Sequence, residues 1–176
     1  MTKALVVVDM QNDFIHGALG TPEARAIVPK VVEKVKKALE SGVDVFYTLD
    51  THGEDYINTQ EGKNLPVPHC IRGTEGWELV KELAELPFVP VFEKHSFGST
   101  ALASYLYDSV YDEVEFIGVC TDICVLSNAI LLKSIDPEVH IKIDSTCCAG
   151  VTPEKHEAAL EAMRSCQIEI VGVKDI

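Results

Sequence analysis

Short runs rich in β-branched residues alternate with longer amphipathic stretches along almost the whole chain, and this alternation restricts the fold more than any other feature. Strand-like runs occupy residues 4–8, 43–48, 88–92, 114–119, 139–143 and 168–173. Helical patterns occupy residues 23–41, 75–86, 101–108, 122–134 and 153–165. Such alternation is typical of parallel strands joined by right-handed crossovers. We therefore predict an α/β fold with one doubly wound, mostly parallel, six-stranded sheet and helices on both faces.

The length of 176 residues suits a single domain, residues 1–176. Hydrophobic residues make up 47% of the chain and charged residues 24%, as in ordinary globular domains. No linker-like segment interrupts the pattern, but residues 51–74 form one long irregular stretch. Loops of that length are uncommon in compact domains unless they have a function, so we expect this one to contribute to a site.

The formal net charge of −13 disfavours nucleic acid and anionic membranes as partners. The early apolar run at residues 4–8 is too short for a signal peptide or a bilayer span. We expect a cytoplasmic protein that acts on a small molecule, and we expect its six cysteines to be reduced thiols.

Three chemically distinct residues stand at strand ends. Asp9 follows the first strand, Lys94 follows the third, and Cys124 begins the helix after the fourth. Ligand sites of such sheets lie at the carboxyl ends of the strands, so an acid, an amine and a thiol should meet there. These are the groups that thiol-based acyl transfer requires. With Thr121 or Asp122 as cap, the helix start should favour the thiolate of Cys124 and offer amides for an oxyanion hole.

Each of these residues also has a plain structural interpretation. A cysteine on a crossover is usually buried apolar filler, an aspartate after a strand commonly caps a turn, and Lys94 alone would be a solvated charge. Only their convergence at one edge favours catalysis.

A second cluster is predicted from Asp50, His52 and His69. Asp50 and His52 are two residues apart at the end of the second strand, so their side chains point to the same side. His69 lies in a proline-rich part of the long loop. Two imidazoles and a carboxylate with open positions suit Zn²⁺, Fe²⁺ or Mn²⁺.

Other groups nearby are open to several interpretations. Cys70 is an alternative thiolate ligand, whereas Glu54 and Asp55 are compatible with a solvated acidic turn. An Asp-x-His pair is itself compatible with a surface role. The remaining histidines are expected on the surface or at a pocket rim, and they are His16, His95, His140 and His156.

Taken together, these motifs resemble the isochorismatase-like cysteine hydrolase superfamily and, within it, the nicotinamidase (pyrazinamidase) subgroup. The resemblance is carried by Val-Val-Asp-Met-Gln-Asn-Asp-Phe at residues 7–14, Asp-Thr-His at 50–52, Pro-His-Cys at 68–70, Lys94, and Gly-Val-Cys-Thr-Asp-Ile-Cys-Val at 118–125. It implies that Cys124 is the nucleophile, that Asp9 transfers protons, and that Lys94 is the cation of the triad.

The resemblance further implies a cis peptide between Val119 and Cys120, with the amides of Cys120 and Cys124 as the oxyanion hole. It implies that Asp50, His52 and His69 hold one divalent metal ion, for which zinc is the first choice. Of the aromatic residues, Phe14 would pack against the substrate ring and Phe97 would form a pocket wall.

The chain departs from the subgroup at two positions. A tryptophan that often precedes the Pro-x-His stretch is replaced by Asn-Leu-Pro-Val at residues 64–67. A further histidine found in some members is matched by Asn58. The second wall of the pocket should therefore differ.

The implied activity is hydrolysis of nicotinamide to nicotinate and ammonia through a cysteine thioester, in a homo-oligomer. A related enzyme would act on an N-carbamoyl compound, a ureide or another small amide. An enol-ether hydrolase without a cysteine nucleophile fits less well, because Cys124 is present. The non-enzymatic alternative is a binding module with a vestigial pocket.

Overall fold

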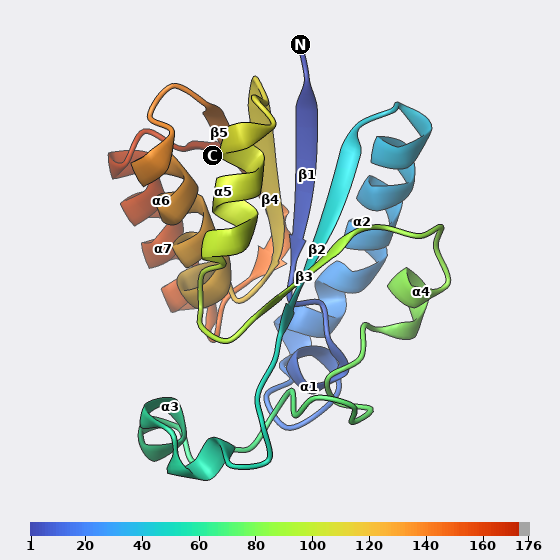
Figure 1. Ribbon diagram of the computed structural model, residues 1–176, viewed down its shortest axis with the longest axis vertical. Coiled ribbons are helices and arrows are strands. Elements are labelled where there is room, and N and C mark those ends of the chain that lie inside the picture. The colour runs from blue at the N-terminus through green and yellow to red at the C-terminus, as the bar shows by residue number, and fades with distance from the viewer. Residues whose placement is uncertain (173–176) are drawn as a thin grey trace.

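The computed structural model describes residues 1–172, and its centre is a six-stranded sheet in the order β3-β2-β1-β4-β5-β6 (Figure 1). Every neighbouring pair of strands is parallel. The strands are β1 (Lys3–Val8), β2 (Asp44–Asp50), β3 (Val91–Lys94), β4 (Glu113–Val119), β5 (His140–Ala149) and β6 (Glu169–Val171). The predicted α/β class with a six-stranded parallel sheet is confirmed.

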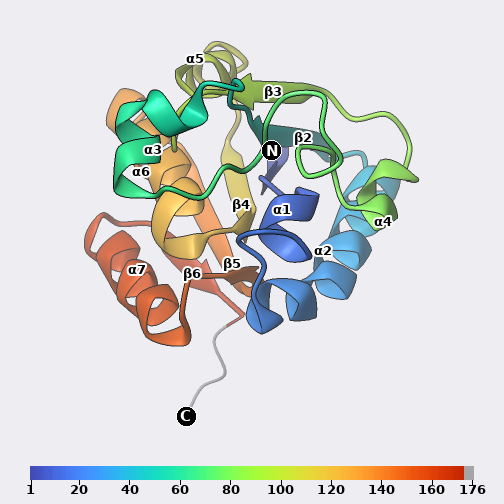
Figure 2. The same ribbon diagram turned by 90° about the horizontal axis from the view of Figure 1, so that it is seen from below.

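Helices cover both faces of this sheet (Figures 1 and 2). One face carries α2 (Pro22–Glu40) and α4 (Lys81–Ala84), and the other carries α5 (Thr100–Asp108), α6 (Leu126–Ile135) and α7 (Pro153–Ser165). The shorter elements are α1 (Asn12–Ile15), the 3₁₀-helix η1 (Tyr56–Asn58), α3 (Gln60–Asn64) and the π-helical turn η2 (Thr121–Val125). None of the helices within residues 1–172 has the length and hydropathy needed to cross a membrane.

Threonine caps and prolines define where the two long outer helices begin. Thr21 accepts a hydrogen bond from the amide of Ala24 at the start of α2, and Thr152 accepts one from Lys155 at the start of α7. A proline follows each cap, where its missing N–H costs nothing. The cap predicted at Thr152 is confirmed.

The run of valines in β1 is explained by burial on both faces. Val6 and Val8 are fully buried, and so are Val114 and Ile117 on the adjacent β4. Each such side chain stabilises the fold by about 1.5–3 kcal/mol relative to an exposed one. A central parallel strand is therefore continuously apolar and does not alternate.

The helix predicted at residues 75–86 is wrong over most of its length, since only Lys81–Ala84 is helical. The preceding residues make backbone hydrogen bonds with the segment after β1 instead. Asn12 N donates to Glu78 O, Asp13 N donates to Gly76 O, and Val80 N donates to Met10 O. Tertiary pairing thus overrides an amphipathic pattern.

Three strand boundaries also differ from the prediction. β3 begins at Val91 and not at Phe88, which is 91% exposed. β5 continues to Ala149 through a register shift between Phe116 and Gly118 of β4. β6 spans Glu169–Val171, and Val173, included in the predicted strand, lies outside the described residues.

The strand order reverses direction between β1 and β4, which creates a topological switch point. Gly118 of β4 pairs with Val8 of β1 and has φ +114°, and a Cβ there would clash with the Val8 carbonyl. Only glycine suits this close approach. Asp9, which follows β1, and the residues that follow Gly118 in β4 therefore lie next to each other at the carboxyl edge of the sheet.

Candidate active site

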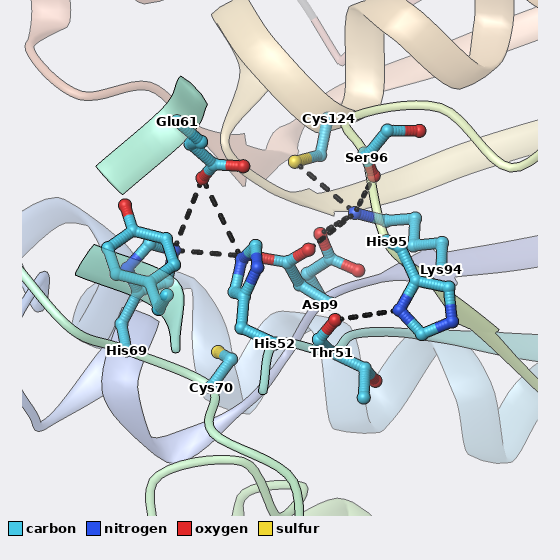
Figure 3. A network of polar contacts seen from close by, with 12 residues as sticks. Asp9, Thr51, His52, Glu61, His69, Cys70, Lys94, His95, Ser96 and Cys124 are labelled. Carbon is cyan, nitrogen blue, oxygen red and sulfur yellow. Dashed lines mark hydrogen bonds and ion pairs between the residues drawn. The ribbon is translucent and has the colours of Figure 1, made fainter. Parts of the chain in front are cut away.

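Lys94, the last residue of β3, joins two other residues predicted for catalysis. Its Nζ lies 2.6 Å from Asp9 Oδ2 and 3.5 Å from Cys124 Sγ (Figure 3). The Lys94 Nζ also donates to the carbonyl of Ser96 at 3.1 Å. All three side chains are buried, so the fold brings the predicted acid, cation and thiol together in a site shielded from water.

Asp9 is fixed by β2. Its backbone has φ 50°, in the left-handed region, and Thr48 Oγ1 donates a 2.6 Å hydrogen bond to Asp9 Oδ1. Burial raises the pKa of Asp9 above its ordinary value, although the charge of Lys94 opposes the rise. A carboxylate with a raised pKa accepts a proton more readily, which suits a group that shuttles protons.

Cys124 lies in the turn η2 and not in the first turn of a regular α-helix. Neither predicted cap is formed, because Cys120 occupies the cap position and makes no side-chain cap bond. Burial raises the pKa of Cys124 well above that of an ordinary thiol, and Asp9 raises it further against the charge of Lys94. Burial therefore opposes the thiolate that was expected at this position, whereas the charge of Lys94 favours it as predicted.

The turn before Cys124 begins with a cis peptide between Val119 and Cys120, as expected from the resemblance. The amides of Ile123 and Val125 both donate to the carbonyl of Cys120 at 3.1 Å. Cys120 and Cys124 line the same cavity. Burial raises the pKa of Cys120 to about 12, so its side chain is a neutral thiol.

The three predicted metal ligands come together with a fourth residue, Glu61. Their ligand atoms all lie within 4.8 Å of one another. His52 Nε2 is 2.9 Å from Asp50 Oδ2, His69 Nε2 is 3.5 Å from the same oxygen, and Glu61 Oε1 is 3.7 Å from both nitrogens (Figure 3). Two nitrogens and two carboxylates converging in this way fit a Zn²⁺-type site.

Neighbouring groups orient these ligands. His69 Nδ1 lies 2.8 Å from the carbonyl of Val67, and a hydrogen bond donated there leaves the Nε2 lone pair facing the cluster. Burial would raise the pKa of Asp50, but the neighbouring imidazoles of His52 and His69 and the charge of Lys94 hold it below its ordinary value. Asp50 is therefore ionised, as a ligand must be.

Glu61 was not predicted from the sequence. It lies in the first turn of α3, where Thr59 caps the helix by accepting from the amide of Gly62 at 3.0 Å. Figure 1 shows α3 on the long loop below the carboxyl edge of the sheet. The sequence signal that could have pointed to Glu61 is Thr59, a possible helix cap two residues before it, within a loop already expected to contribute to a site.

The other loop residues do not join the cluster. Cys70 is buried beside it, with its amide donating to Asp13 Oδ2 at 2.8 Å, and burial raises the pKa of its thiol. Glu54, Asp55 and Asn58 are exposed. The alternative of Cys70 as a ligand therefore has no support in the geometry, and the solvated acidic turn agrees with the structure.

Gln11 links the segment after β1 to the metal cluster, a role not predicted from the sequence. Its Oε1 accepts from the amide of Asp50 at 2.8 Å, and its Nε2 donates to the carbonyls of Asp50 and Trp77 at 2.8 and 2.7 Å. Gln11 is fully buried. One side chain thus fixes the backbone from which a ligand projects.

A cavity of about 280 Å³ opens over Cys124 and the cluster. Phe14 and Phe97, both predicted as substrate contacts, line it, and the Phe14 ring lies edge-on to His69 at 5.5 Å. Leu65 belongs to the segment 64–67, where related proteins often carry a tryptophan, and it lines the cavity. Trp77 does not line the cavity, and its indole N–H donates to Thr51 Oγ1. The walls of the pocket formed by Phe14, Phe97 and Leu65 are therefore apolar.

The remaining histidines divide into two groups. His16, His95 and His140 are exposed, as predicted. His156 is half-buried on α7, and its Nδ1 lies 2.7 Å from Thr121 Oγ1.

Comparison with known proteins places this chain in a family. The isochorismatase domain model matches residues 3–175, and the chain belongs to the isochorismatase family of hydrolases. The pyrazinamidase of Pyrococcus horikoshii, solved in complex with zinc, superposes with a TM-score of 0.84 at 33% identity, covering 98% of this chain and 100% of that one.

Curated relatives are similar over nearly the whole chain. A nicotinamidase/pyrazinamidase of Mycobacterium tuberculosis is 29% identical, over 96% of this chain and 98% of that protein. A protein of Arabidopsis thaliana described as a probable inactive nicotinamidase is 33% identical, over 97% and 90%.

Proposed function

We propose that the chain is a nicotinamidase-like amidohydrolase that converts nicotinamide to nicotinate and ammonia. The observation that carries the proposal is the position of Lys94, whose Nζ lies 2.6 Å from Asp9 and 3.5 Å from Cys124. The four-residue ligand cluster beside it and the similarity to nicotinamidases support the substrate.

In the first half of the reaction, Asp9 takes the thiol proton of Cys124 and the sulfur attacks the amide carbon. The C–S bond forms as the carbonyl π electrons move to oxygen, where the amides of Cys120 and Cys124 would stabilise the negative charge. Lys94 holds Asp9 and the developing thiolate in place. Collapse of this intermediate breaks the C–N bond while Asp9 returns its proton to nitrogen, which releases ammonia and leaves a thioester.

In the second half, Asp9 accepts a proton from water as the water oxygen attacks the thioester carbon. The new C–O bond forms, the C–S bond breaks, and the proton returns to the sulfur of Cys124. The raised pKa of Asp9 suits this repeated acceptance and return of one proton.

Asp50, His52, Glu61 and His69 would hold one divalent ion, with Zn²⁺ as first choice and Fe²⁺ or Mn²⁺ as alternatives. When bound, such an ion supplies a Lewis acid for the ring nitrogen of the substrate. Phe14 and Phe97 would hold the ring itself. Beyond the single chain, we also propose a homo-oligomer, which light scattering would test.

A second candidate function is hydrolysis of an N-carbamoyl compound or ureide that bears a carboxylate. The observation that favours it is Lys155, a cation that lines the same cavity near the start of α7. A carboxylate on the substrate would pair with its ammonium group, whereas nicotinamide offers no such charge.

Ammonia release distinguishes these functions. Purified protein with added Zn²⁺, Fe²⁺ or Mn²⁺ should release ammonia from nicotinamide, and Cys124→Ala should abolish release. A chelator should suppress turnover of nicotinamide but not of a substrate held by Lys155. Undiminished turnover by Cys124→Ala would exclude the thioester mechanism, and no turnover of any amide would favour a binding module.

A further inference from the structure

We propose that His156 is a positioning residue that holds the oxyanion-hole turn through Thr121. The inference rests on the proposed amide hydrolysis, because it concerns the turn from Cys120 to Cys124. His156 belongs to α7, more than thirty residues beyond this turn in the sequence, and among residues 1–172 the one hydrogen bond of its side chain is with Thr121.

The first observation is the environment of Thr121. This residue is fully buried, and its Oγ1 shares a 2.7 Å hydrogen bond with His156 Nδ1. Among residues 1–172 the hydroxyl has no other hydrogen-bond partner. A buried hydroxyl left without a partner costs about 1–3 kcal/mol, so His156 determines where this side chain can lie.

The second observation is the place of Thr121 in the turn. It follows Cys120 directly, and Cys120 follows the cis peptide. A shift of Thr121 would therefore move the peptide unit of Cys120, whose amide is proposed to stabilise the oxyanion. Oxyanion-hole donors act only when they lie close to the position of the developing charge.

The third observation is that the segment leading into α7 lies against the turn at two further points. Asp122 Oδ1 accepts from the amide of Val151 at 2.9 Å. A Cβ at Gly150 would lie 2.8 Å from His156 N and 2.9 Å from Asp122 Oδ1, so no side chain fits between them. The segment leading into α7 and the first turn of this helix thus approach the turn closely.

The imidazole is suited to this role as a neutral group. Burial lowers the pKa of His156 below its ordinary value, although Glu157 and Asp122 act in the opposite direction. A neutral ring protonated on Nε2 accepts the hydroxyl proton of Thr121 at Nδ1. Phenylalanine fills the same space without this acceptor, and asparagine places a polar atom near the Nδ1 position.

The test compares His156→Phe and Thr121→Val with the conservative variants His156→Asn and Thr121→Ser. We expect kcat for nicotinamide to fall roughly 10- to 100-fold in the first two, with KM changed less than about twofold, because the turn is displaced and the pocket is not. The conservative variants should stay within about threefold of wild type. The double variant His156→Phe/Thr121→Val should be no slower than the worse single variant.

A second readout is independent of amide turnover. With pyridine-3-carboxaldehyde, the sulfur of Cys124 should add to the carbonyl carbon while its proton passes to Asp9 and the carbonyl π electrons move to oxygen. The resulting oxyanion would need the same amides. The affinity for this aldehyde should fall in His156→Phe and Thr121→Val in parallel with kcat for nicotinamide. The matched control is His16→Phe at an exposed position, which should change neither quantity.

The outcomes separate the two proposals. If wild-type protein binds the aldehyde but releases no ammonia from nicotinamide, the proposed substrate fails, and the aldehyde affinities alone decide the role of His156. Equal kcat in wild type and His156→Phe, a rise in KM alone, additive effects in the double variant, or no rescue by His156→Asn would each overturn the inference. Absence of any wild-type adduct would overturn both proposals.

Discussion

The side-chain amide of Gln11 makes two hydrogen bonds with the backbone of Asp50, one to its N–H and one to its carbonyl, each 2.8 Å long. Gln11 thereby ties the chain after β1 to the end of β2. The proposed catalytic carboxylate Asp9 and the proposed ligand Asp50 are thus connected through one short segment.

Replacing Gln11 should loosen the metal cluster without touching a ligand. Gln11→Ala leaves two buried backbone groups of Asp50 unpaired, so we expect a loss of about 1–3 kcal/mol in the free energy of unfolding. Zn²⁺ affinity should fall roughly 10- to 100-fold, as for other groups that orient ligands. Isothermal titration calorimetry with Zn²⁺ and denaturant unfolding measure the two effects. Wild-type affinity in Gln11→Ala would show that Asp50 is held by other contacts.

Removing Lys94 should be costly because it leaves Asp9 buried without a counter-charge. We expect Lys94→Met to lose about 3–5 kcal/mol of stability and to reduce kcat roughly 100-fold or more. The double variant Lys94→Met/Asp9→Asn removes both charges, so it should recover stability but not activity. Urea unfolding and ammonia release provide the measurements. A double variant as unstable as Lys94→Met would contradict the pairing.

Glu61 should behave as a ligand and not as a surface charge. We expect Glu61→Gln to weaken Zn²⁺ binding at least roughly 10-fold, because a neutral amide replaces an anionic donor. Glu54→Gln, on the exposed part of the same loop, is the matched control and should bind Zn²⁺ like wild type. Competition with a chromophoric chelator measures both. Equal affinities in the two variants would remove Glu61 from the ligand set.

Glu113, at the opposite end of the sheet, should make stability sensitive to acid. Burial opposes ionisation, but Lys142 at 2.8 Å and Lys3 at 3.0 Å lower the pKa of Glu113 from 4.5 to about 2. A depressed folded-state pKa contributes stability above pH 4.5 that is lost as the pH falls toward 2.

We therefore expect Glu113→Gln to have a lower Tm than wild type at pH 7, with the difference shrinking between pH 4.5 and pH 2. The control is Glu138→Gln at an exposed position without an ion pair among the described residues. Calorimetry at several pH values gives the comparison. If the difference in Tm between wild type and Glu113→Gln does not change with pH, the ion pairs of Glu113 do not cause the loss of stability in acid.

The sequence predicted the triad because parallel strands bring their carboxyl ends to one edge, whatever their separation along the chain. To place Asp9, Lys94 and Cys124 at one site, it was enough to predict where the first, third and fourth strands end. Glu61 could not be placed in this way, because a loop helix carries it and no strand fixes its direction. The expectation of a favoured thiolate at Cys124 did not include burial, which sequence alone does not give and which raises the pKa of this thiol.

The predicted helix at residues 75–86 failed for a related reason. Its apolar spacing is compatible with a helix, but the backbone of residues 76–80 is occupied by hydrogen bonds to the segment from Met10 to Asp13. Such pairing depends on the position of the chain after β1, which no local window contains.

β3 is an edge strand of four residues, hydrogen-bonded on one side only, and its last residue is Lys94. Short edge strands open locally at a lower free energy than the centre of a sheet. Each such opening would withdraw the ammonium group from Asp9 and Cys124 while β1 and β4 stayed paired. We therefore expect the proposed catalytic group of Asp9, Lys94 and Cys124 to be disrupted at a lower temperature than the sheet, so that inactivation precedes unfolding.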